Sequence, residues 1–565
     1  MYSELINTLK PIPKLNLTWY KDEDFYSEGD IEDAIIQLIA NNPPEDYSDI
    51  ICQHFSWSTY YHLTHLRKNI LNWYPFSKDA SVLEIGCGMG AITSVLCDHC
   101  KEVTSVELSK RRATATLLRC REKSNLEIIV GNLNDIEFDK KFDYITLIGV
   151  LEYQGSYTNT DNPYSDFLKR IKTLLKPNGK LLIAIENQYG LKYWCGARED
   201  HTSIPFDGMN QYTLTSKKVR TFSKSALDEL IKLSGYKNTY FYYPMPDYKL
   251  PTVVYSQNYL PQNHNMQNFR TYYVPDTSTL IAQEEHIYQD IIDNDVFEFF
   301  ANSFLVECSD DDNLGCVTFA SLSSERTIDH RIGTRFVSDD SVEKFALNAL
   351  SIEHIAQTSK NEKTLAQRGI RVLKSSFEQN KIISAYSDAP LLEYILLNAF
   401  EQKDYDKIYS FLDMVYADIL TSSETIAASE NILFTLGLDI QKEPLSYGPI
   451  LKTGYLDMLF RNAFLADDSL QWFDQEWILE NIPAKYILYR AIMTFYSSYP
   501  KCNTILPLET IATHYQFLNN IADFRMIEEL FMGAVIDQNH MAASRVFRDS
   551  NRNSCITNIQ KLLNT

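Results

Sequence analysis

A glycine-rich turn near residue 86 constrains the fold of this chain more than any other feature. The stretch Ser81–Leu96, "SVLEIGCGMGAITSVL", passes from a short apolar, β-rich segment through Gly86, Gly88 and Gly90 into a helical segment. Glycines let the backbone turn tightly after a strand and approach a ligand closely. The sequence therefore predicts a strand–turn–helix unit that holds a nucleotide-bearing ligand, although a turn of this kind that serves packing alone stays an alternative.

The residue in front of the turn distinguishes two ligand classes. Dinucleotide enzymes prefer the pattern G-x-G-x-x-G and bind a pyrophosphate at the helix N-terminus. Here Glu84 precedes the first glycine, and the last glycine of that pattern is missing. A carboxylate at this position repels a pyrophosphate but suits a ligand with a positively charged amino group, such as S-adenosylmethionine.

Further strands and helices alternate up to about residue 187, which implies parallel βαβ units. We expect strands that end near Glu107, Asn132, Glu152 and Asn187. Ligands in such sheets bind outside the carboxyl ends of the strands. An acid at the position of Glu107 typically binds ribose hydroxyls, and Asn132 is placed to reach the adenine amine.

Residues 78–255 resemble the class I S-adenosylmethionine-dependent methyltransferases in the turn, the acid of the second strand, the "LLKPNGKLLI" turn and the strand order. The resemblance implies a Rossmann-like α/β domain over residues 78–260, with a helical cap over residues 1–77. It also implies a set of cofactor-binding residues, namely Glu84, Gly86, Gly88, Gly90, Glu107, Asn132, Leu133 and Glu152. Tyr153 stands where the family often has histidine, which leaves the catalytic base open.

The acceptor site is expected in residues 185–212, "IENQYGLKYWCGAREDHTSIPFDGMNQY", which follow the fifth strand. This segment mixes aromatic, basic and acidic residues, and we interpret it as a substrate lid. His201 is the candidate catalytic base. A structured loop with incidental polar residues is the alternative, and an acceptor that is already anionic needs no base.

A second signature lies near the other end of the chain. After a linker expected at residues 261–285, residues 286–565 read as strands followed by helices. Asp457 and Asn462 form a D-x-x-x-x-N pattern, and Asp474 follows it. This spacing resembles the catalytic loop and metal-binding aspartate of protein-kinase-like phosphotransferases. The resemblance implies an α+β kinase-like domain in which Asp457 orients a hydroxyl, while Asn462 and Asp474 hold Mg²⁺ between the phosphates of ATP.

The second signature is incomplete. Tyr455 and Leu456 replace the usual His-Arg pair, "FDQEW" replaces D-F-G, and no glycine loop or V-A-I-K strand is evident. A helix expected over residues 341–357 would carry Glu353 as the ion-pairing glutamate. The basic residues on the expected third strand are Arg331 and Arg335, and neither is the usual lysine. A helical domain that matches the spacing by chance is the alternative.

Composition narrows the classes of partner. The chain of 565 residues has a net charge of −21, which disfavours nucleic-acid binding. Ten cysteines without paired metal motifs suit the reduced cytoplasm, and "CDHC" (Cys97–Cys100) reads as packing. No apolar run approaches the length of a membrane-spanning helix, and the N-terminus lacks the layout of a signal peptide.

The whole layout resembles the bifunctional methyltransferase–kinases that cap bacterial O-antigen polysaccharides. The resemblance implies a cytoplasmic enzyme that methylates a cell-surface glycan or its phosphorylated terminus, with peripheral association with glycan-assembly proteins. The long C-terminal coiled coil of that family is missing here. Two alternatives stay open: a degenerate kinase-like half that only recruits a partner, and an unrelated interaction domain beside a methyltransferase of small molecules or proteins. The sequence does not indicate an oligomeric state.

Overall fold

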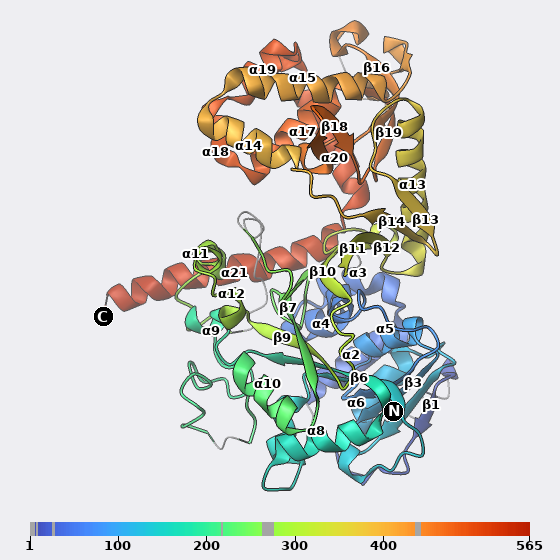
Figure 1. The fold of residues 1–565 in the computed structure, drawn as a ribbon, viewed down its shortest axis with the longest axis vertical. Coiled ribbons are helices and arrows are strands. Elements are labelled where there is room, and N and C mark those ends of the chain that lie inside the picture. Colours follow the sequence, from blue (N-terminus) through green and yellow to red (C-terminus); the bar gives the residue numbers. More distant parts are fainter. Residues whose placement is uncertain are drawn as a thin grey trace. The chain divides into compact units, whose positions relative to one another are not determined.

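The computed structural model describes residues 6, 9–24, 29–215, 218–262, 276–338, 340–435 and 442–564. The chain forms two compact units (Figure 1). The first unit comprises Met1–Glu325, Val337–Asp339 and Asp537–Thr565, and the second comprises Arg326–Phe336 and Asp340–Ile536. The second unit is therefore an insertion in the sequence of the first.

A twisted sheet forms the centre of the first unit. In spatial order its strands are β1 (Lys14–Asn16), β4 (Leu126–Val130), β3 (Glu102–Glu107), β2 (Ser81–Ile85), β5 (Phe142–Ile148), β6 (Leu175–Glu186), β9 (Ser303–Ser309), β7 (Asn238–Met245), β8 (Val253–Ser256) and β10 (Val317–Leu322). The strands from β1 to β6 pair in parallel, whereas β9, β7, β8 and β10 pair antiparallel. All five residues of β2 are buried, as expected for a parallel strand covered on both faces.

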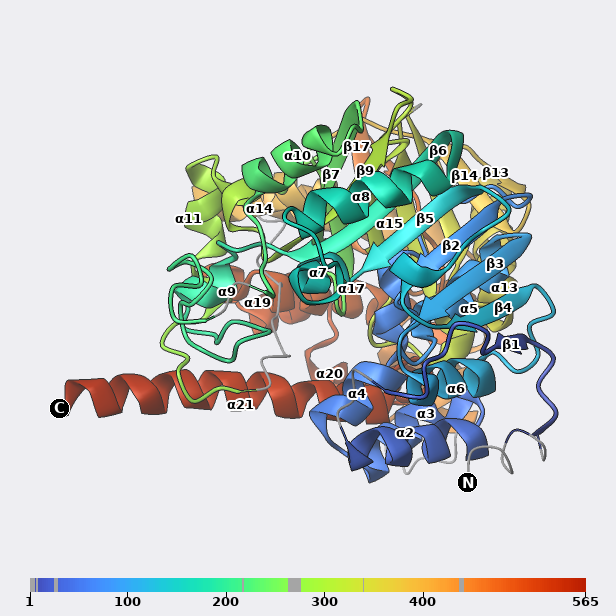
Figure 2. The ribbon, with the colours of Figure 1, turned by 90° about the horizontal axis from the view of Figure 1, so that it is seen from below.

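Helices cover both faces of this sheet. The helices of the first unit are α2 (Asp30–Asn41), α3 (Tyr47–Gln53), α4 (Trp57–Leu63), α5 (Ala91–His99), α6 (Lys110–Arg119), α7 (Gln154–Tyr157), α8 (Pro163–Leu174), α9 (Leu191–Trp194), α10 (Lys224–Leu233), α11 (Tyr288–Asp293), α12 (Phe297–Phe300) and α21 (Gln538–Leu563). Figure 2 shows α8 and α10 on one face of the sheet, and α2 and α6 on the other. The side chain of Ser109 caps α6 by accepting a hydrogen bond from the backbone N–H of Arg112.

The boundary between the units differs from the one expected at residue 286. Strand β9, expected to open the second domain, pairs with both β6 and β7 of the first unit, and Val306 faces Ile183 and Phe241. All seven of its residues are buried, so the sheet is incomplete without it. The expected linker falls largely on residues 263–275, which lie outside the described residues. The N-terminal segment contains α2–α4, together with β1, which sequence reasoning did not predict.

The second unit begins with a sheet of β11 (Ile332–Val337), β12 (Ser341–Ala346), β14 (Lys381–Ala385) and β13 (Ser375–Glu378), in that spatial order. Helix α13 (Ile352–Gln367) packs on β12, β13 and β14. The helix predicted over residues 341–357 is therefore wrong at its start, because residues 341–346 pair antiparallel with β14 and Lys344 faces Ile382. A 3-10 turn covers Ala349–Ser351, and the α-helix begins only at Ile352.

The rest of the second unit is mainly helical. Its helices are α14 (Leu392–Gln402), α15 (Tyr405–Thr421), α16 (Ile432–Thr435), α17 (Ala484–Ser498), α18 (Pro500–Ile505), α19 (Leu508–His514) and α20 (Ile521–Val535). One small sheet contains β15 (Thr425–Ile426), β16 (Ile450–Tyr455) and β19 (Ile478–Pro483), and β17 (Ala463–Ala466) pairs with β18 (Ser469–Trp472). Helix α17 is apolar around most of its circumference, and it is correspondingly buried in the core of this unit. In the described part of the chain, no helix is both long and apolar enough to cross a membrane.

Candidate active site

The glycine turn between β2 and α5 has the backbone conformation that its sequence predicts. Gly86, Gly88 and Gly90 have φ angles of 79°, 55° and 81°, in the left-handed region that favours glycine. A Cβ atom at Gly86 would lie 2.5 Å from Cγ2 of Val150, and one at Gly90 would lie 2.9 Å from Cα of Thr116. Around Gly88 there is open space. Gly86 and Gly90 therefore permit close packing, whereas Gly88 leaves its backbone accessible.

Glu107, the last residue of β3, fixes this turn. Its carboxylate accepts hydrogen bonds from the backbone N–H of Gly88 (2.8 Å) and of Ser109 (3.1 Å). Burial raises the pKa of the Glu107 carboxyl above its usual range. An acceptor that is already tied to the ligand turn is well placed to receive ribose hydroxyls.

The carboxyl ends of the strands surround a cavity of about 500 Å³. This volume lies within the range of small-molecule sites. The residues predicted from the sequence that line it are Gly86, Gly88, Glu107, Asn132, Leu133, Glu152 and His201. Asn132 is held in place because its side chain accepts from Asn134 N–H at 3.0 Å and donates to the carbonyl of Tyr157 at 3.4 Å.

Three predicted residues lie elsewhere. Glu84 is not among the residues that line the cavity, since its carboxylate accepts from Thr93 Oγ1 (2.7 Å) and Ser105 Oγ (2.6 Å). Burial raises the pKa of this carboxyl to about 7. Gly90 packs against α6, and Asn187 donates to backbone carbonyls of residues 299 and 301. The side chains of Glu84 and Asn187 are thus held by other protein groups, and the contact of Glu84 with the cofactor stays a prediction.

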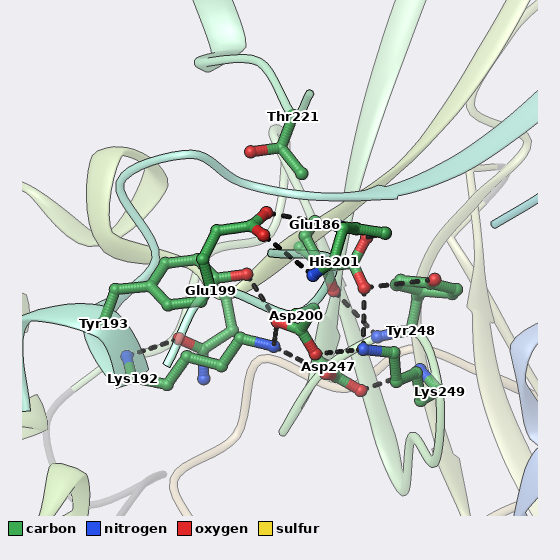
Figure 3. Close-up of polar contacts among 12 residues, drawn as sticks. Glu186, Lys192, Tyr193, Glu199, Asp200, His201, Thr221, Asp247, Tyr248 and Lys249 are labelled. Atoms are coloured by element: carbon green, nitrogen blue, oxygen red, sulfur yellow. Dashed lines mark hydrogen bonds and ion pairs between the residues drawn. The ribbon is translucent and has the colours of Figure 1, made fainter. Parts of the chain in front are cut away.

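His201 reaches the cavity from the segment predicted as a lid, and carboxylates surround its imidazole (Figure 3). Its Nδ1 lies 3.1 Å from Glu199 Oε1, and its Nε2 lies 3.6 Å from Glu152 Oε1 and 3.9 Å from Glu186 Oε2. Burial alone would lower the pKa of His201, but Glu186, Glu152 and Glu199 raise it well above the usual range. The ring packs edge to face on Tyr153, the position at which the family often has histidine, with centroids 5.2 Å apart.

Two lysines balance part of this negative charge. Lys249 contacts Glu186 at 2.7 Å and also pairs with Asp200, while Lys192 contacts Asp200 at 2.8 Å and Asp247 at 3.4 Å. Figure 3 shows these side chains as one connected network below His201. Glu186, Lys192, Glu199 and Asp200 all lie in the segment 185–212, which the sequence predicts as the acceptor site. Sequence reasoning missed Asp247 and Lys249, because only the folding of the chain after β7 brings these two residues to the site.

The second unit brings Asp457 and Asn462 together with the segment of Asp474. The side chain of Asn462 donates to the carbonyl of Asp457 at 3.1 Å. Asp457 Oδ2 accepts from the backbone N–H of Glu476 (3.0 Å) and of Trp477 (3.2 Å). The buried carboxylate of Asp457 is therefore occupied by backbone groups, and burial followed by the nearby Glu476 raises its pKa.

Lys344 on β12 is a buried cation of this region, and it was not predicted because its strand was interpreted as a helix. Its ammonium contacts Asp474 and lies 2.8 Å from Glu476 Oε1. Glu476 Oε2 also contacts Arg326 and lies 2.9 Å from His354 Nε2. The backbone N–H of Asp474 donates to Glu362 of α13 at 3.1 Å.

The other basic and acidic residues predicted for the second unit do not join this cluster. Glu353 is exposed near the start of α13, so it is not the buried glutamate of the helix, a position that Glu362 takes. Arg335 pairs with Glu343 on the neighbouring strand at 2.6 Å, and Arg331 donates to the carbonyl of Arg326 at 3.0 Å. The predicted roles of these three residues are therefore not supported by their positions.

The family model that matches this chain lies in the first unit. Residues 83–183 match the family model described as a methyltransferase domain. An uncharacterized methyltransferase of Staphylococcus carnosus is 31% identical over 145 residues, which are 26% of this chain and 59% of that protein. Nodulation protein S of Rhizobium tropici is 24% identical over 115 residues, or 20% of this chain and 47% of that protein. The chain thus spans less than two thirds of the length of these relatives.

Solved structures give weaker similarities. The N-methyltransferase NodS of Bradyrhizobium japonicum WM9, solved with S-adenosyl-L-homocysteine, is 21% identical with a TM-score of 0.21, and the match covers 29% of this chain and 76% of that one. The family model, the parallel strands from β1 to β6 and the glycine turn agree with one another. The N-terminal part of the chain is a methyltransferase domain with the Rossmann-like class I fold.

Proposed function

We propose that the first unit binds S-adenosylmethionine in the 500 Å³ cavity and transfers its methyl group to an acceptor that enters beside His201. The observation that carries this proposal is the convergence of Gly88, Glu107 and Asn132 on one cavity, at the carboxyl ends of parallel strands. The similarity to proteins named as methyltransferases supports it.

The chemistry requires little from the protein beyond placement. A lone pair of the acceptor attacks the methyl carbon, the S–C bond breaks, and its electrons return to sulfur, so that the sulfonium becomes a neutral thioether. Positioning of the two reactants supplies most of the rate in such a displacement. Where the acceptor is a hydroxyl, its proton must also leave. His201 is a candidate for that step only after it has lost its own proton, since the three surrounding glutamates favour the charged ring.

For the acceptor we propose a bacterial cell-surface glycan or its phosphorylated terminus. The resemblance of the whole layout supports this class, and so does the lining of the cavity. Glu152, Glu186 and Asp200 offer carboxylate oxygens that accept hydrogen bonds from sugar hydroxyls. The alternative is a small molecule or protein acceptor, with a second unit that only binds a partner. The ubiquinone biosynthesis O-methyltransferase of Pelagibacter ubique among the relatives favours a small molecule.

The second unit carries a second candidate function, phosphate transfer from Mg²⁺–ATP to the acceptor. Its support is the meeting of a strand lysine, Lys344, with Asp474, beside Glu362 of the following helix. In kinases a strand lysine, a helix glutamate and a metal-binding aspartate meet in this way. Asp457 and Asn462 lie in the same neighbourhood, as the proposal requires.

Calorimetric titration of the full chain with S-adenosylmethionine and, separately, with Mg²⁺–ATP tests both functions. We expect both ligands to bind, and Asp474→Ala to abolish ATP binding alone. Transfer of a radiolabelled methyl group to oligosaccharides that end in a free or phosphorylated hexose, compared with small amines, then identifies the acceptor class. Absence of S-adenosylmethionine binding would refute the first function, and absence of ATP binding would refute the second.

A further inference from the structure

We propose that Glu152, Glu186 and His201 form a binding site for one divalent transition-metal ion in the wall of the methyltransferase cavity. The three side chains each direct one ligand atom to a common point, and these atoms all lie within 4.8 Å of one another. Zn²⁺ and related ions bind nitrogen and oxygen ligands at about 2.0–2.2 Å. Bound ligand atoms are therefore separated by roughly 4 Å at most, so a small inward movement of the side chains would complete the site.

Unpartnered oxygens inside the cluster are the second observation. Glu152 and Glu186 are 1% and 0% exposed, yet Oε2 of each has no hydrogen-bond partner in the structure. A buried carboxylate oxygen without a partner is costly, because it has lost water and gained nothing in exchange. By contrast Oε1 of Glu186 is satisfied by Lys249 at 2.7 Å and by Tyr248. Each glutamate thus keeps one oxygen free for a cation.

The orientation of His201 supports the same site. Glu199 accepts from the backbone N–H groups of His201 and Thr202 at 2.7 Å each, and its Oε1 faces His201 Nδ1 at 3.1 Å. A carboxylate that accepts a hydrogen bond from Nδ1–H keeps the proton on that nitrogen, so that Nε2 of the neutral ring carries the electron pair. This arrangement is the usual one around metal-bound histidines. Nε2 faces Glu152 and Glu186, and a metal ion bound there would take the place of the proton that otherwise lies between the ring and these two carboxylates.

The network around His201 contains more carboxylates than cations, which favours the binding of a metal ion. Five carboxylates belong to this network, from Glu152, Glu186, Glu199, Asp200 and Asp247, whereas its cations are Lys192, Lys249 and, when protonated, His201. Mixed imidazole and carboxylate ligands favour ions such as Mn²⁺, Fe²⁺ or Zn²⁺ over Mg²⁺ or Ca²⁺, which prefer oxygen alone. We therefore infer an ion of the Mn²⁺ or Zn²⁺ class.

The site faces the cavity, since all three ligands line it. Three protein ligands leave coordination positions open, as in catalytic rather than structural metal sites. An acceptor oxygen bound there would be held near the methyl donor and, if a hydroxyl, would lose its proton more readily. The ion would also offset the repulsion between the glutamates and a phosphorylated acceptor. This role rests on the proposed methyl transfer, whereas the ion site itself does not.

The test is a titration of the full chain, freed of metal by a chelator, with Mn²⁺ or Zn²⁺ in the absence of nucleotide. We expect one ion per chain, with an affinity at least about 10-fold weaker in Glu186→Gln and in His201→Asn. His286→Ala, which removes an exposed imidazole of the same unit, is the matched control and should bind like the parent. Asp474→Asn shows whether an ion also binds in the second unit, because such an ion would be lost in this variant.

Two further measurements keep the test decisive. Thermal unfolding establishes that each variant is folded, and Glu152→Gln provides a third ligand variant if one of the others is not. The Co²⁺-loaded chain should show visible absorption bands that shift in His201→Asn. No binding up to roughly 1 mM metal, or equal affinity in the parent and the ligand variants, would overturn the site. Binding of methylammonium in place of metal would overturn it as well. Retained metal binding without S-adenosylmethionine binding would refute only the proposed methyl transfer.

Discussion

His201 in the first unit and His354 in the second are both buried beside carboxylates, but charge is arranged around them in opposite ways. Three glutamates surround the single imidazole of His201. In the second unit one carboxylate, that of Glu476, is surrounded by Lys344, Arg326 and His354. The cluster of Glu476 satisfies its carboxylate completely, whereas the cluster of His201 leaves carboxylate oxygens without hydrogen-bond partners beside a cavity.

This difference indicates that buried charge stabilises the fold in the second unit and is available for ligand binding in the first. A carboxylate that is fully paired holds surrounding elements together, and its loss leaves buried cations uncompensated. A cluster with more carboxylates than cations can bind a ligand that supplies positive charge or hydrogen-bond donors. Such clusters are typical of functional sites. The two clusters should therefore respond in different ways to neutralisation, and four predictions test this.

The largest effect is expected from Glu476→Gln. The substitution removes the carboxylate that neutralises Lys344 and Arg326, and breaking a buried pair of this kind costs about 3–5 kcal/mol. Urea unfolding measures this loss in the free energy of unfolding. Glu424→Gln, which removes an exposed partner of Arg368, should change it by less than about 1 kcal/mol. Equal losses in both variants would show that the Glu476 cluster does not stabilise the second unit.

The next effect is the pH dependence contributed by Glu84. Its pKa is raised from 4.5 to about 7 in the folded protein, so between these values the folded chain holds a proton that the unfolded chain has released. The contribution of Glu84 to stability is thus fully present below about pH 4.5, and about 3 kcal/mol is lost as the pH rises through 7. Glu84→Gln should remove this dependence.

Urea unfolding of the parent and Glu84→Gln at pH 5 and at pH 8 measures that difference, with the exposed Glu102→Gln as control. Glu476 should show the opposite sign, because Lys344 and Arg326, against the effect of burial, hold its pKa well below the usual range. Its contribution is present above its unfolded pKa and is lost as the pH falls through the depressed value. Parallel pH profiles for the two glutamates would contradict the contrast between the units.

A smaller, ligand-specific effect is expected from Glu107→Gln. The amide keeps an acceptor for Gly88 N–H but loses the charge that strengthens hydrogen bonds from ribose, so S-adenosylmethionine should bind about 10-fold more weakly. Calorimetry measures the affinity, and Mg²⁺–ATP binding should not change. If the variant lost both ligands, the two units would not act as separate binding sites.

The smallest effect is expected from Glu152→Gln. Because this carboxylate lies against Glu186 and has an oxygen without a hydrogen-bond partner, its neutralisation should leave the free energy of unfolding of the metal-free chain within about 0.5 kcal/mol of the parent. Thermal or urea unfolding in the presence of a chelator measures this. A loss as large as that of Glu476→Gln would mean that both clusters are structural.

Sequence reasoning predicted the parts of the molecule that are local in sequence. The turn at Gly86–Gly90, Glu107 at the end of β3, and Asn132 with its neighbour follow from periodicity and from the geometry of a strand followed by a helix. Asp457 and Asn462 were likewise found from a fixed spacing, and they are in contact. Such features depend on residues only a few positions apart.

The features that sequence reasoning missed depend on pairing between distant segments. β9 completes the first sheet although α11 and α12 precede it and it follows β8 by a long insertion. Lys344 was missed because the spacing of apolar residues in "SVEKFALNAL" fits a helix, whereas pairing with β14 makes the first half of this segment a strand. The three carboxylates around His201 come from the turn after β5 (Glu152), the end of β6 (Glu186) and the lid segment (Glu199), and no local sequence pattern predicts such a set.

The position of α21 has a consequence for synthesis on the ribosome. This helix packs on α3, and its residues Ser544 and His540 contact Tyr60 and Thr64 near α4, so it belongs to the first unit. It emerges only after the whole second unit has been translated. Until then the nascent first unit exposes the apolar surface that Ala543 and Phe547 later cover. Chaperones therefore have a defined interval in which to bind this surface, and translation that stalls within the second unit would leave a methyltransferase domain prone to aggregation.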